Sequence, residues 1–375
     1  MFCFIGLPPT RPRLLVPLAS PSVQAQAFHL YSPGSLQGKL YKIMGRWAGR
    51  TGLLSLMGRI ISRNAGQFNV PVAIQPILQP VILQTLQMNW QKVIGVNSLT
   101  FALAWGKPSP YQKAAALIFD TEGKAVALAK IGATGKAQRL IENEQITLKR
   151  LQTVGVDCAR FPMCYGHGKV GSVSWLLQEP ILEGRPSPND LKEAHFSFLA
   201  AFARATVHDA GSVPSAGSFQ AHFTAMLDHK PLPIKAAFKG EAAFIDRIAA
   251  ICRDAIRCGR LKPGPFTAAH GDFAPWNLRS SSGRLTVFDW EYFLPSVPAG
   301  WDILHFVFRV ENLIRRQPLQ KIFERYVAGA YQDSLSLWQK RARLTVADRE
   351  LLGMMVLLAI ATEFIPEWIC RERIL

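Results

Sequence analysis

Three polar side chains set between two apolar runs constrain this chain more than any other feature. The runs cover residues 266–270 and 285–288, and turn-forming residues bound both of them. Short apolar runs of this kind are typical of buried strands. Asp272 and Asn277 lie in the loop between the runs, and Asp289 follows the second run. The sequence therefore predicts that an amide and two carboxylates meet at the ends of neighbouring strands.

The order of these residues suits phosphoryl transfer. An aspartate can accept the proton of an attacking hydroxyl, while an asparagine and a second aspartate hold magnesium ions. Protein-kinase catalytic loops have the same Asp-to-Asn step, with arginine where this chain has Gly271. The plain alternative is that Asp272 and Asn277 are turn residues and Asp289 ends a strand. That alternative explains each residue singly but not all three in order.

The sequence motifs around these residues are typical of a known family. His270-Gly-Asp-Phe-Ala-Pro-Trp-Asn277, followed by Asp289-Trp-Glu-Tyr292, resembles the aminoglycoside phosphotransferase and choline kinase branch of the kinase-like fold. The resemblance implies that Asp272 is the catalytic base. It also implies that Asn277 and Asp289 are the metal ligands.

The resemblance extends through motifs over residues 97–310 and implies an α+β, two-lobed protein-kinase-like fold. We expect a basic N-terminal extension over residues 1–95, for which we find no counterpart. A β-rich, nucleotide-binding N-lobe is expected over residues 96–184. A helical C-lobe with the catalytic loop, metal site and acceptor site is expected over residues 185–375. Within it, Asp302 is expected to anchor the catalytic loop.

A lysine and a glutamate are expected to orient the nucleotide phosphates. Lys130 ends an alternating strand over residues 124–131, on the face of Val126 and Leu128. A lysine on an apolar face needs an anionic partner, since an unpaired buried ammonium is costly. Glu144 interrupts the apolar stripe of the helix expected over residues 137–153, whereas Glu142 falls on a more polar face. A surface pair without function is the alternative.

Two further segments are expected to contact the nucleotide. The turn Gly106-Lys-Pro-Ser-Pro110 lacks a glycine-rich cradle, and its prolines remove two N–H groups. Ser109 is the best remaining phosphate contact there, with a plain hairpin turn as the alternative. By the resemblance, the backbone of Glu179 and Ile181 forms the hinge that reads the adenine edge.

The charge of the chain is uneven. It has 43 Lys and Arg against 26 Asp and Glu, a net charge of +17, and no acidic residue precedes Asp120. Such a field attracts phosphates, acidic saccharides or an anionic membrane surface. Nucleic acid is not expected as a partner, because the basic residues lack interleaved exposed aromatics for stacking.

Eleven basic residues precede Asp120, and several of them lie on a helix expected over residues 38–62. They are Arg11, Arg13, Lys39, Lys42, Arg46, Arg50, Arg59, Arg63, Lys92, Lys107 and Lys113. The same helix carries an apolar stripe that includes Trp47. A basic-face helix with a tryptophan is typical of membrane surfaces. The favoured interpretation is a solvated face over a stripe buried in the core.

The rest of the sequence indicates a globular, cytoplasmic protein. The six cysteines form no Cys-x-x-Cys pattern, so reduced thiols are expected. Residues 14–18 are expected as an edge strand. Residues 351–362 are apolar but short, which favours a buried helix over a membrane span.

We therefore predict an ATP- and Mg²⁺-dependent phosphotransferase that acts on a hydroxyl of a small molecule such as a sugar or glycan precursor. The charge favours an acidic or membrane-associated acceptor over a cationic one and leaves peripheral membrane contact open. The alternatives are a catalytically weak nucleotide-binding pseudokinase, a protein kinase and a nucleic-acid-binding protein. Gly271, and the lack of an Ala-Pro-Glu sequence after Asp289, disfavour the protein kinase.

Overall fold

The computed structural model describes residues 3–8, 12–30, 36–208, 214–259, 265–346 and 348–371. The side chains of residues 36, 37, 39, 59–61, 214–218, 370 and 371 are outside that description. Arg11, Lys39 and Arg59, three of the basic residues before Asp120, are therefore not described at side-chain level.

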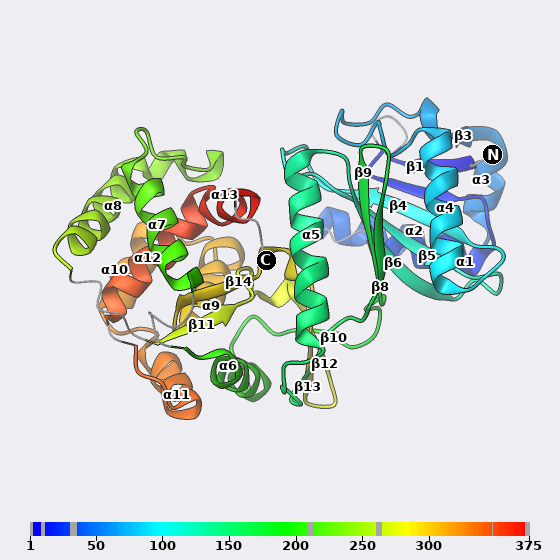
Figure 1. Cartoon of the computed structure of the whole chain (residues 1–375). Helices are drawn as coiled ribbons and strands as arrows, with labels where there is room; N and C mark the ends of the chain where they lie inside the picture. Colours follow the sequence, from blue (N-terminus) through cyan, green and yellow to red (C-terminus); the bar gives the residue numbers. More distant parts are fainter. Residues whose placement is uncertain are drawn as a thin grey trace. The chain divides into compact units, whose positions relative to one another are not determined.

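Two compact units make up the chain. The first comprises Met1–Lys149 and Pro162–Leu182, and the second comprises Arg150–Phe161 and Glu183–Leu375. A large antiparallel sheet dominates the first unit, whereas the second is mainly helical (Figure 1). The predicted α+β class, with a β-rich part and a helical part, is confirmed.

The described residues of the first unit form an eight-stranded antiparallel sheet in the order β3-β1-β2-β4-β5-β6-β9-β8. Its strands are β1 (Cys3–Leu7), β2 (Leu14–Pro17), β3 (Arg63–Asn64), β4 (Thr100–Trp105), β5 (Ala114–Phe119), β6 (Ala125–Gly132), β8 (Cys164–Val170) and β9 (Val173–Gln178). Antiparallel hairpins join β4 to β5, β5 to β6 and β8 to β9, within the residues expected as a β-rich lobe. Turn chemistry explains the β5–β6 connection, where the Asp120 side chain accepts backbone N–H bonds from Glu122 and Lys124 at 3.0 and 2.8 Å.

The N-terminal segment belongs to this sheet. β2 pairs with β1 on one side and β4 on the other, so the prediction of an edge strand at residues 14–18 is wrong. The reason is burial: all four residues of β2 are buried, and an edge would leave one row of their backbone groups unpaired. The expected extension thus contributes strands β1–β3 to the sheet that carries Lys130.

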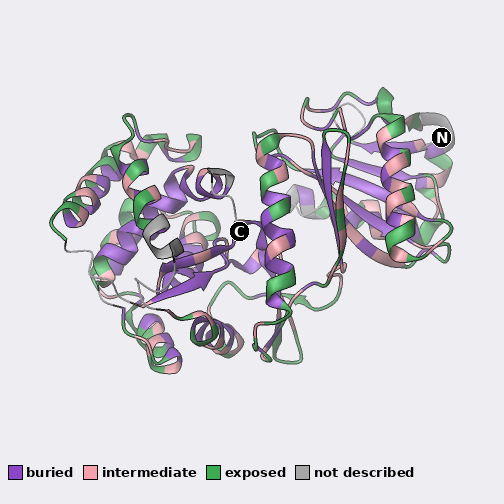
Figure 2. Cartoon of the chain, viewed as in Figure 1, coloured by how far each residue is buried: buried purple, intermediate pink, exposed green. Residues whose placement is uncertain are grey.

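Helices cover both faces of the sheet, whose central strands are buried along most of their length (Figure 2). On one face, α4 (Pro80–Ile94) buries Leu83, Leu86 and Trp90 in a cluster with the strands. On the other, α1 (Pro21–Ala27) and α3 (Leu53–Ile61) pack over a second cluster. Because successive side chains of a strand point to opposite faces, β5 gives Ile118 to the first cluster and Leu117 to the second.

The expected core stripe of residues 38–62 is not buried. α2 (Leu36–Arg50) exposes Leu40, Ile43, Met44 and Trp47, so the interpretation of a stripe facing the core is wrong. The physical reason is that α2 packs on α1 through its glycines instead. A Cβ at Gly45 would lie 2.1 Å from the Phe28 ring.

The described residues of the second unit form two small sheets and the C-terminal helices. One sheet has the order β10-β12-β13-β7, and β11 pairs with β14. The strands are β7 (Ala159–Arg160), β10 (Arg185–Pro186), β11 (Phe266–Ala269), β12 (Leu278–Ser281), β13 (Arg284–Val287) and β14 (Leu294–Pro298). The helices are α6 (Glu193–Thr206), α7 (Pro214–Asp228), α8 (Ala242–Arg257), α9 (Trp301–Arg309), α10 (Leu319–Val327), α11 (Gln332–Ala342), α12 (Arg349–Ala361) and α13 (Phe364–Arg371).

The apolar segment at residues 351–362 forms most of α12, and every residue from Leu351 to Ala361 is buried. The prediction of a buried core helix is confirmed. Among the described residues, none of the helices combines the length and the apolar character that crossing a membrane requires.

Candidate active site

The loop after β11 and the end of β13 bring the predicted residues of the second unit together. β11 ends at Ala269, and the following loop carries Asp272 and then Asn277, the last residue of a short 3₁₀ helix. β12 returns through β13, after which Asp289 begins another 3₁₀ turn. The Asp289 carboxylate raises the pKa of Asp272.

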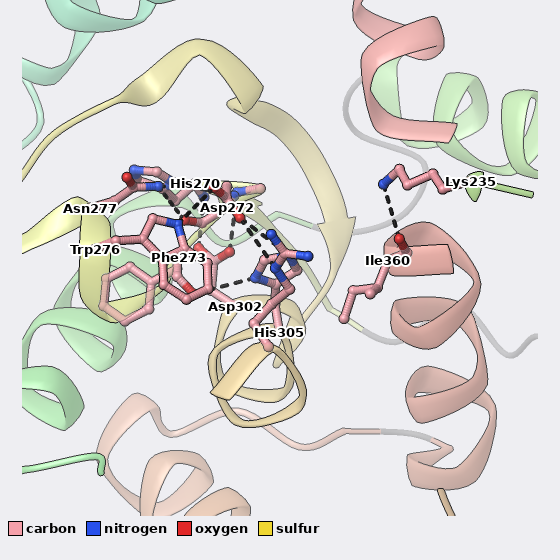
Figure 3. A network of polar contacts seen from close by, with 11 residues as sticks. Lys235, His270, Asp272, Phe273, Trp276, Asn277, Asp302, His305 and Ile360 are labelled. Carbon is pink, nitrogen blue, oxygen red and sulfur yellow. Dashed lines mark hydrogen bonds and ion pairs between the residues drawn. The ribbon is translucent and has the colours of Figure 1, made fainter. Parts of the chain in front are cut away.

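Asp272 is held by side chains of its own loop (Figure 3). Its Oδ2 accepts hydrogen bonds from Asn277 Nδ2 at 3.0 Å and from the Trp276 indole at 3.3 Å. Asn277 Nδ2 also donates to the Asp272 carbonyl at 2.9 Å. Two oxygen partners identify this atom as the NH₂ group, because only a donor can face both. The amide oxygen of Asn277 is therefore the atom that remains for a cation.

The groups around Asp272 shift its pKa in opposite directions. Burial raises the pKa of Asp272, the Arg309 guanidinium lowers it, and the Asp289 carboxylate raises it again. Arg309 Nε lies 3.7 Å from Asp272 Oδ1, and His305 Nε2 lies 3.9 Å from the same oxygen. Burial holds the pKa of His305 well below its usual range, so the imidazole is neutral at pH 7. Arg309 is then the cation that most favours the ionised form of Asp272.

Asp302 ties the loop to α9, as the sequence predicts. Its two carboxylate oxygens accept the backbone N–H groups of His270 at 2.6 Å and Gly271 at 3.2 Å. Burial raises the pKa of Asp302 to about 7, although both N–H bonds favour the ionised form. The His270 ring adds a second tie. Its Nδ1 accepts from the Asp272 N–H at 3.2 Å, so its Nε2 donates to the Phe288 carbonyl at 3.0 Å.

Gly271 has a steric reason to be glycine. Its φ is +79°, and a Cβ would lie 2.0 Å from the Tyr292 carbonyl oxygen. A backbone atom cannot move aside as a flexible side chain can, so any other residue would displace the loop. The departure from the arginine of protein kinases follows from this close approach. Asp289 also adopts a left-handed conformation, with φ +69°.

Sequence reasoning missed Arg309 and Lys235. The Arg309 guanidinium lies 5.3 Å from the centre of the Trp276 ring, and its Nε is buried without a hydrogen-bond partner among the described residues. A usable signal exists for Arg309: with Asp302 and His305 it forms a polar line at positions i, i+3 and i+7 of the otherwise apolar α9.

Lys235 precedes a short 3₁₀ helix in a stretch without periodicity, so the sequence offers no signal for it. Its Nζ donates to the Ile360 carbonyl at 3.0 Å (Figure 3). Burial lowers the pKa of Lys235 to about 8; Glu363 raises it, Arg309 lowers it, and Asp272 raises it. A half-buried lysine within electrostatic reach of the candidate base thus changes charge near physiological pH.

In the first unit, the predicted Lys130–Glu144 ion pair is confirmed. Lys130 Nζ lies 2.6 Å from both carboxylate oxygens of Glu144, whose side chain is fully buried on α5 (Gly135–Leu151). Glu142 is half-exposed and pairs with Arg139. The alternation of β6 is as predicted, but Ala127 and Ala129 of its alanine face are the fully buried residues. The side that carries Lys130 and Leu128 is only partly buried and remains accessible.

The remaining nucleotide-contact candidates are also placed in the first unit. Ser109 is exposed in the β4–β5 turn, which Gln112 closes by donating to the Gly106 carbonyl at 2.8 Å. After β9, the Glu179 N–H donates to the Met163 carbonyl at 2.9 Å. Because this N–H is already used, the backbone group of Glu179 that could contact an adenine ring is its carbonyl. Ile181 follows at the end of the unit, and both hinge assignments stay predictions.

Comparison with known proteins gives structural matches only. No family model matches the sequence, and no curated protein matches it significantly. Among solved structures, the chain is similar to a spectinomycin phosphotransferase in complex with ADP and spectinomycin, with 14% identity, a TM-score of 0.45, and coverage of 72% of this chain and 83% of that one. A GDP complex of an aminoglycoside 2′-phosphotransferase has 8% identity and a TM-score of 0.45, covering 75% and 88%.

A glucosamine kinase matches with 14% identity and a TM-score of 0.37, over 74% of this chain and 78% of that one. These similarities are distant.

The Asp302 anchor predicts a large loss of stability when it is removed. Asp302→Ala leaves two buried N–H groups without acceptors, and each orphaned group costs about 1–3 kcal/mol. We expect the free energy of unfolding to fall by about 2–5 kcal/mol in urea titrations. Asp333→Ala, at an exposed helix start, is the matched control and should change it by less than about 1 kcal/mol. Equal stability of Asp302→Ala and wild type would contradict the anchoring role.

The Lys130–Glu144 pair predicts a graded effect on nucleotide use. Lys130→Ala removes a charged donor, so the KM for ATP should rise about 10- to 100-fold, as expected for a lost charge-assisted hydrogen bond. Glu144→Ala should do the same more mildly by releasing the lysine. Glu142→Ala, on the exposed face of the same helix, should leave the KM unchanged. Wild-type kinetics of Lys130→Ala at low ATP would remove the pair from the mechanism.

Proposed function

We propose that this chain is a cytoplasmic enzyme that transfers the γ-phosphoryl group of ATP to a hydroxyl of a small molecule. The observation that carries the proposal is the state of Asp272. Its carboxylate is oriented by Asn277 and Trp276, lies 3.7 Å from Arg309, and has a second carboxylate, Asp289, close by. A structural carboxylate needs only a neutralising partner. This one has a fixed orientation, partial exposure and a neighbouring anion.

Asp272 acts as the general base. Burial raises its pKa, which improves its capacity to accept a proton, while the Arg309 guanidinium favours the ionised form. The acceptor hydroxyl gives its proton to the Asp272 carboxylate as its oxygen bonds to the γ-phosphorus. The bond between that phosphorus and the β,γ-bridging oxygen breaks, and ADP leaves with the bonding electrons.

The residues fit a magnesium ion. Asn277 uses its NH₂ group on two oxygens of Asp272, so an amide oxygen remains, and Asp289 supplies a carboxylate nearby. Hard oxygen donors of this kind are what Mg²⁺ prefers. When bound, the ion would neutralise charge on the triphosphate. The protein contributes the placement of both donors, one on each side of the β12–β13 hairpin.

Lys130 and Glu144 would act on the nucleotide from the first unit. Glu144 is fully buried and accepts both contacts of the Lys130 ammonium, which fixes the lysine on the accessible side of β6. A lysine so oriented suits the α- and β-phosphates, whose charge it can share with the metal. Ser109 and the backbone of Glu179 and Ile181 complete the proposed contacts.

We propose further that the acceptor carries an anionic group. Arg309 and Lys235 are cations within electrostatic reach of Asp272, and Arg309 Nε is a buried donor without a hydrogen-bond partner among the described residues. Among the described residues, Glu363 and Asp272 are the acidic neighbours that raise the pKa of Lys235. A carboxylate or phosphate on the acceptor would pair with these cations while its hydroxyl reaches Asp272. A cationic acceptor would meet repulsion from both.

Replacement of the two carboxylates separates their roles. Asp272→Asn keeps the shape but removes the base, so ATP should still bind while turnover falls by about 10²–10⁴. Asp289→Ala should weaken Mg²⁺-dependent ATP binding as well, because it removes a metal ligand. Nucleotide binding by calorimetry and ADP release with an acceptor found by screening measure the two effects.

Two results would count against the proposal. Phosphate transfer by Asp272→Asn at the wild-type rate would exclude its role as base. Wild-type protein that binds ATP but turns over with no acceptor, across neutral sugars, sugar acids, sugar phosphates and amino sugars, would favour a nucleotide-binding pseudokinase.

The acceptor proposal predicts a pH dependence from Lys235. Its pKa of about 8 means that the ammonium is charged below pH 8 and neutral above it. The KM for a carboxylate-bearing acceptor should rise up to about tenfold between pH 7 and pH 9, as the charged fraction falls. Lys235→Arg keeps its charge and should abolish that rise. With a neutral acceptor, the KM should not rise with pH for either protein. A KM for the carboxylate acceptor that stays constant with pH in wild type would contradict the proposal.

A further inference from the structure

Two consecutive helices of the first unit expose a run of large apolar side chains. On α2 these are Leu40, Ile43, Met44 and Trp47, and on α3 they are Leu53, Leu56 and Met57, with exposed fractions from 42% to 67%. We call these seven residues the α2–α3 apolar face. Their spacing of three and four residues places each set on one side of its helix. An exposed apolar face of this size is typical of a contact surface.

Glycines on the opposite side prevent these helices from turning the face inward. α2 rests on α1 through Gly45 and Gly49; a Cβ at Gly49 would lie 2.7 Å from the backbone nitrogen of Ala25. Phe28, which closes over Gly45, is fully buried and cannot move aside. On α3, a Cβ at Gly58 would lie 2.3 Å from the Leu18 side chain. The close approach of these backbones therefore orients the apolar face outward.

The charged residues of these two helices have one sign. Arg46 and Arg50 follow one another at a four-residue interval along α2, on the flank between its apolar side and its glycine side. No Asp or Glu occurs in the sequence before Asp120, so neither helix carries an acidic residue. An amphipathic helix with basic flanks and a tryptophan is suited to the boundary between lipid headgroups and acyl chains.

We propose that the α2–α3 apolar face docks on an anionic lipid bilayer. A bilayer offers what both features need at once: acyl chains for seven apolar side chains, and diffuse negative charge for the basic residues. α2, with 15 residues, would lie along the surface over about 22 Å. A second copy of this chain fits less well, because it would bring two positive surfaces together. The docking concerns the first unit and is independent of the proposed chemistry.

The experiment is flotation of the full chain with vesicles of neutral phosphatidylcholine and with vesicles that also contain anionic phosphatidylglycerol. Wild type is expected to float with the anionic vesicles at low salt and to be released as salt rises, since exposed charges are screened over about 10 Å at 0.1 M. Ile43→Ser with Trp47→Ser should weaken binding at least about tenfold. Arg46→Gln with Arg50→Gln should weaken it in anionic vesicles alone.

Matched controls separate the face from general hydrophobicity and charge. Val81→Ser with Met88→Ser changes two apolar residues of α4 that are 72% and 60% exposed, and should bind as wild type. Lys321→Gln with Lys340→Gln removes two exposed charges from the second unit and should also bind as wild type. Thermal melts check that each variant folds. We expect all of them to fold, because none of the substituted side chains is buried in the core.

Three outcomes would overturn the proposal. One is a wild-type protein that stays with neither vesicle at low salt. The second is unchanged binding of Ile43→Ser with Trp47→Ser. The third is a wild-type dimer in light scattering that this variant dissociates without any vesicle binding, which would assign the face to a second copy.

Discussion

The buried carboxylate of Asp302 is the interaction on which the candidate site depends. It accepts two consecutive backbone N–H groups at the point where β11 ends, and so sets the direction in which the chain leaves the strand. The positions of the loop residues from His270 to Asn277 depend on that direction. The cost of burying the charge is visible in the pKa of Asp302, which burial raises to about 7. Two hydrogen bonds to the backbone are what keep an acid in that place.

A buried carboxylate that is held by hydrogen-bond donors also occurs in the first unit. Glu144 is fully buried, and Lys130 satisfies both of its oxygens. The intact pair offsets part of the cost of burying the carboxylate and holds the lysine in one orientation. In each unit, then, a buried acid positions a neighbour: backbone N–H groups in one case and an ammonium in the other. The proposed chemistry needs both neighbours in place before a nucleotide arrives.

The helices α2 and α3 bury small residues and expose large apolar ones. Their buried contacts use glycines, which contribute little apolar area, while their larger apolar residues face outward. This arrangement loses hydrophobic stabilisation that a rotated helix would gain. A surface that binds an apolar partner explains why the chain keeps it. The apolar periodicity of α2 could not reveal this, because a stripe that faces the core and one that faces a partner have the same spacing.

The sequence by itself determined the local chemistry. The strands on either side of the Asp272 loop follow from short apolar runs between turn residues, and the Lys130–Glu144 pair follows from alternation, helical spacing and the cost of unpaired charge. The Asp302 anchor is expected from its place at the start of a helix beyond the loop. The tertiary structure alone decided which elements meet. It placed β2 inside the sheet instead of at its edge, and it brought Lys235 and Arg309 within electrostatic reach of Asp272. Neither outcome is encoded in local periodicity, since contacts between residues distant in sequence depend on how whole elements pack.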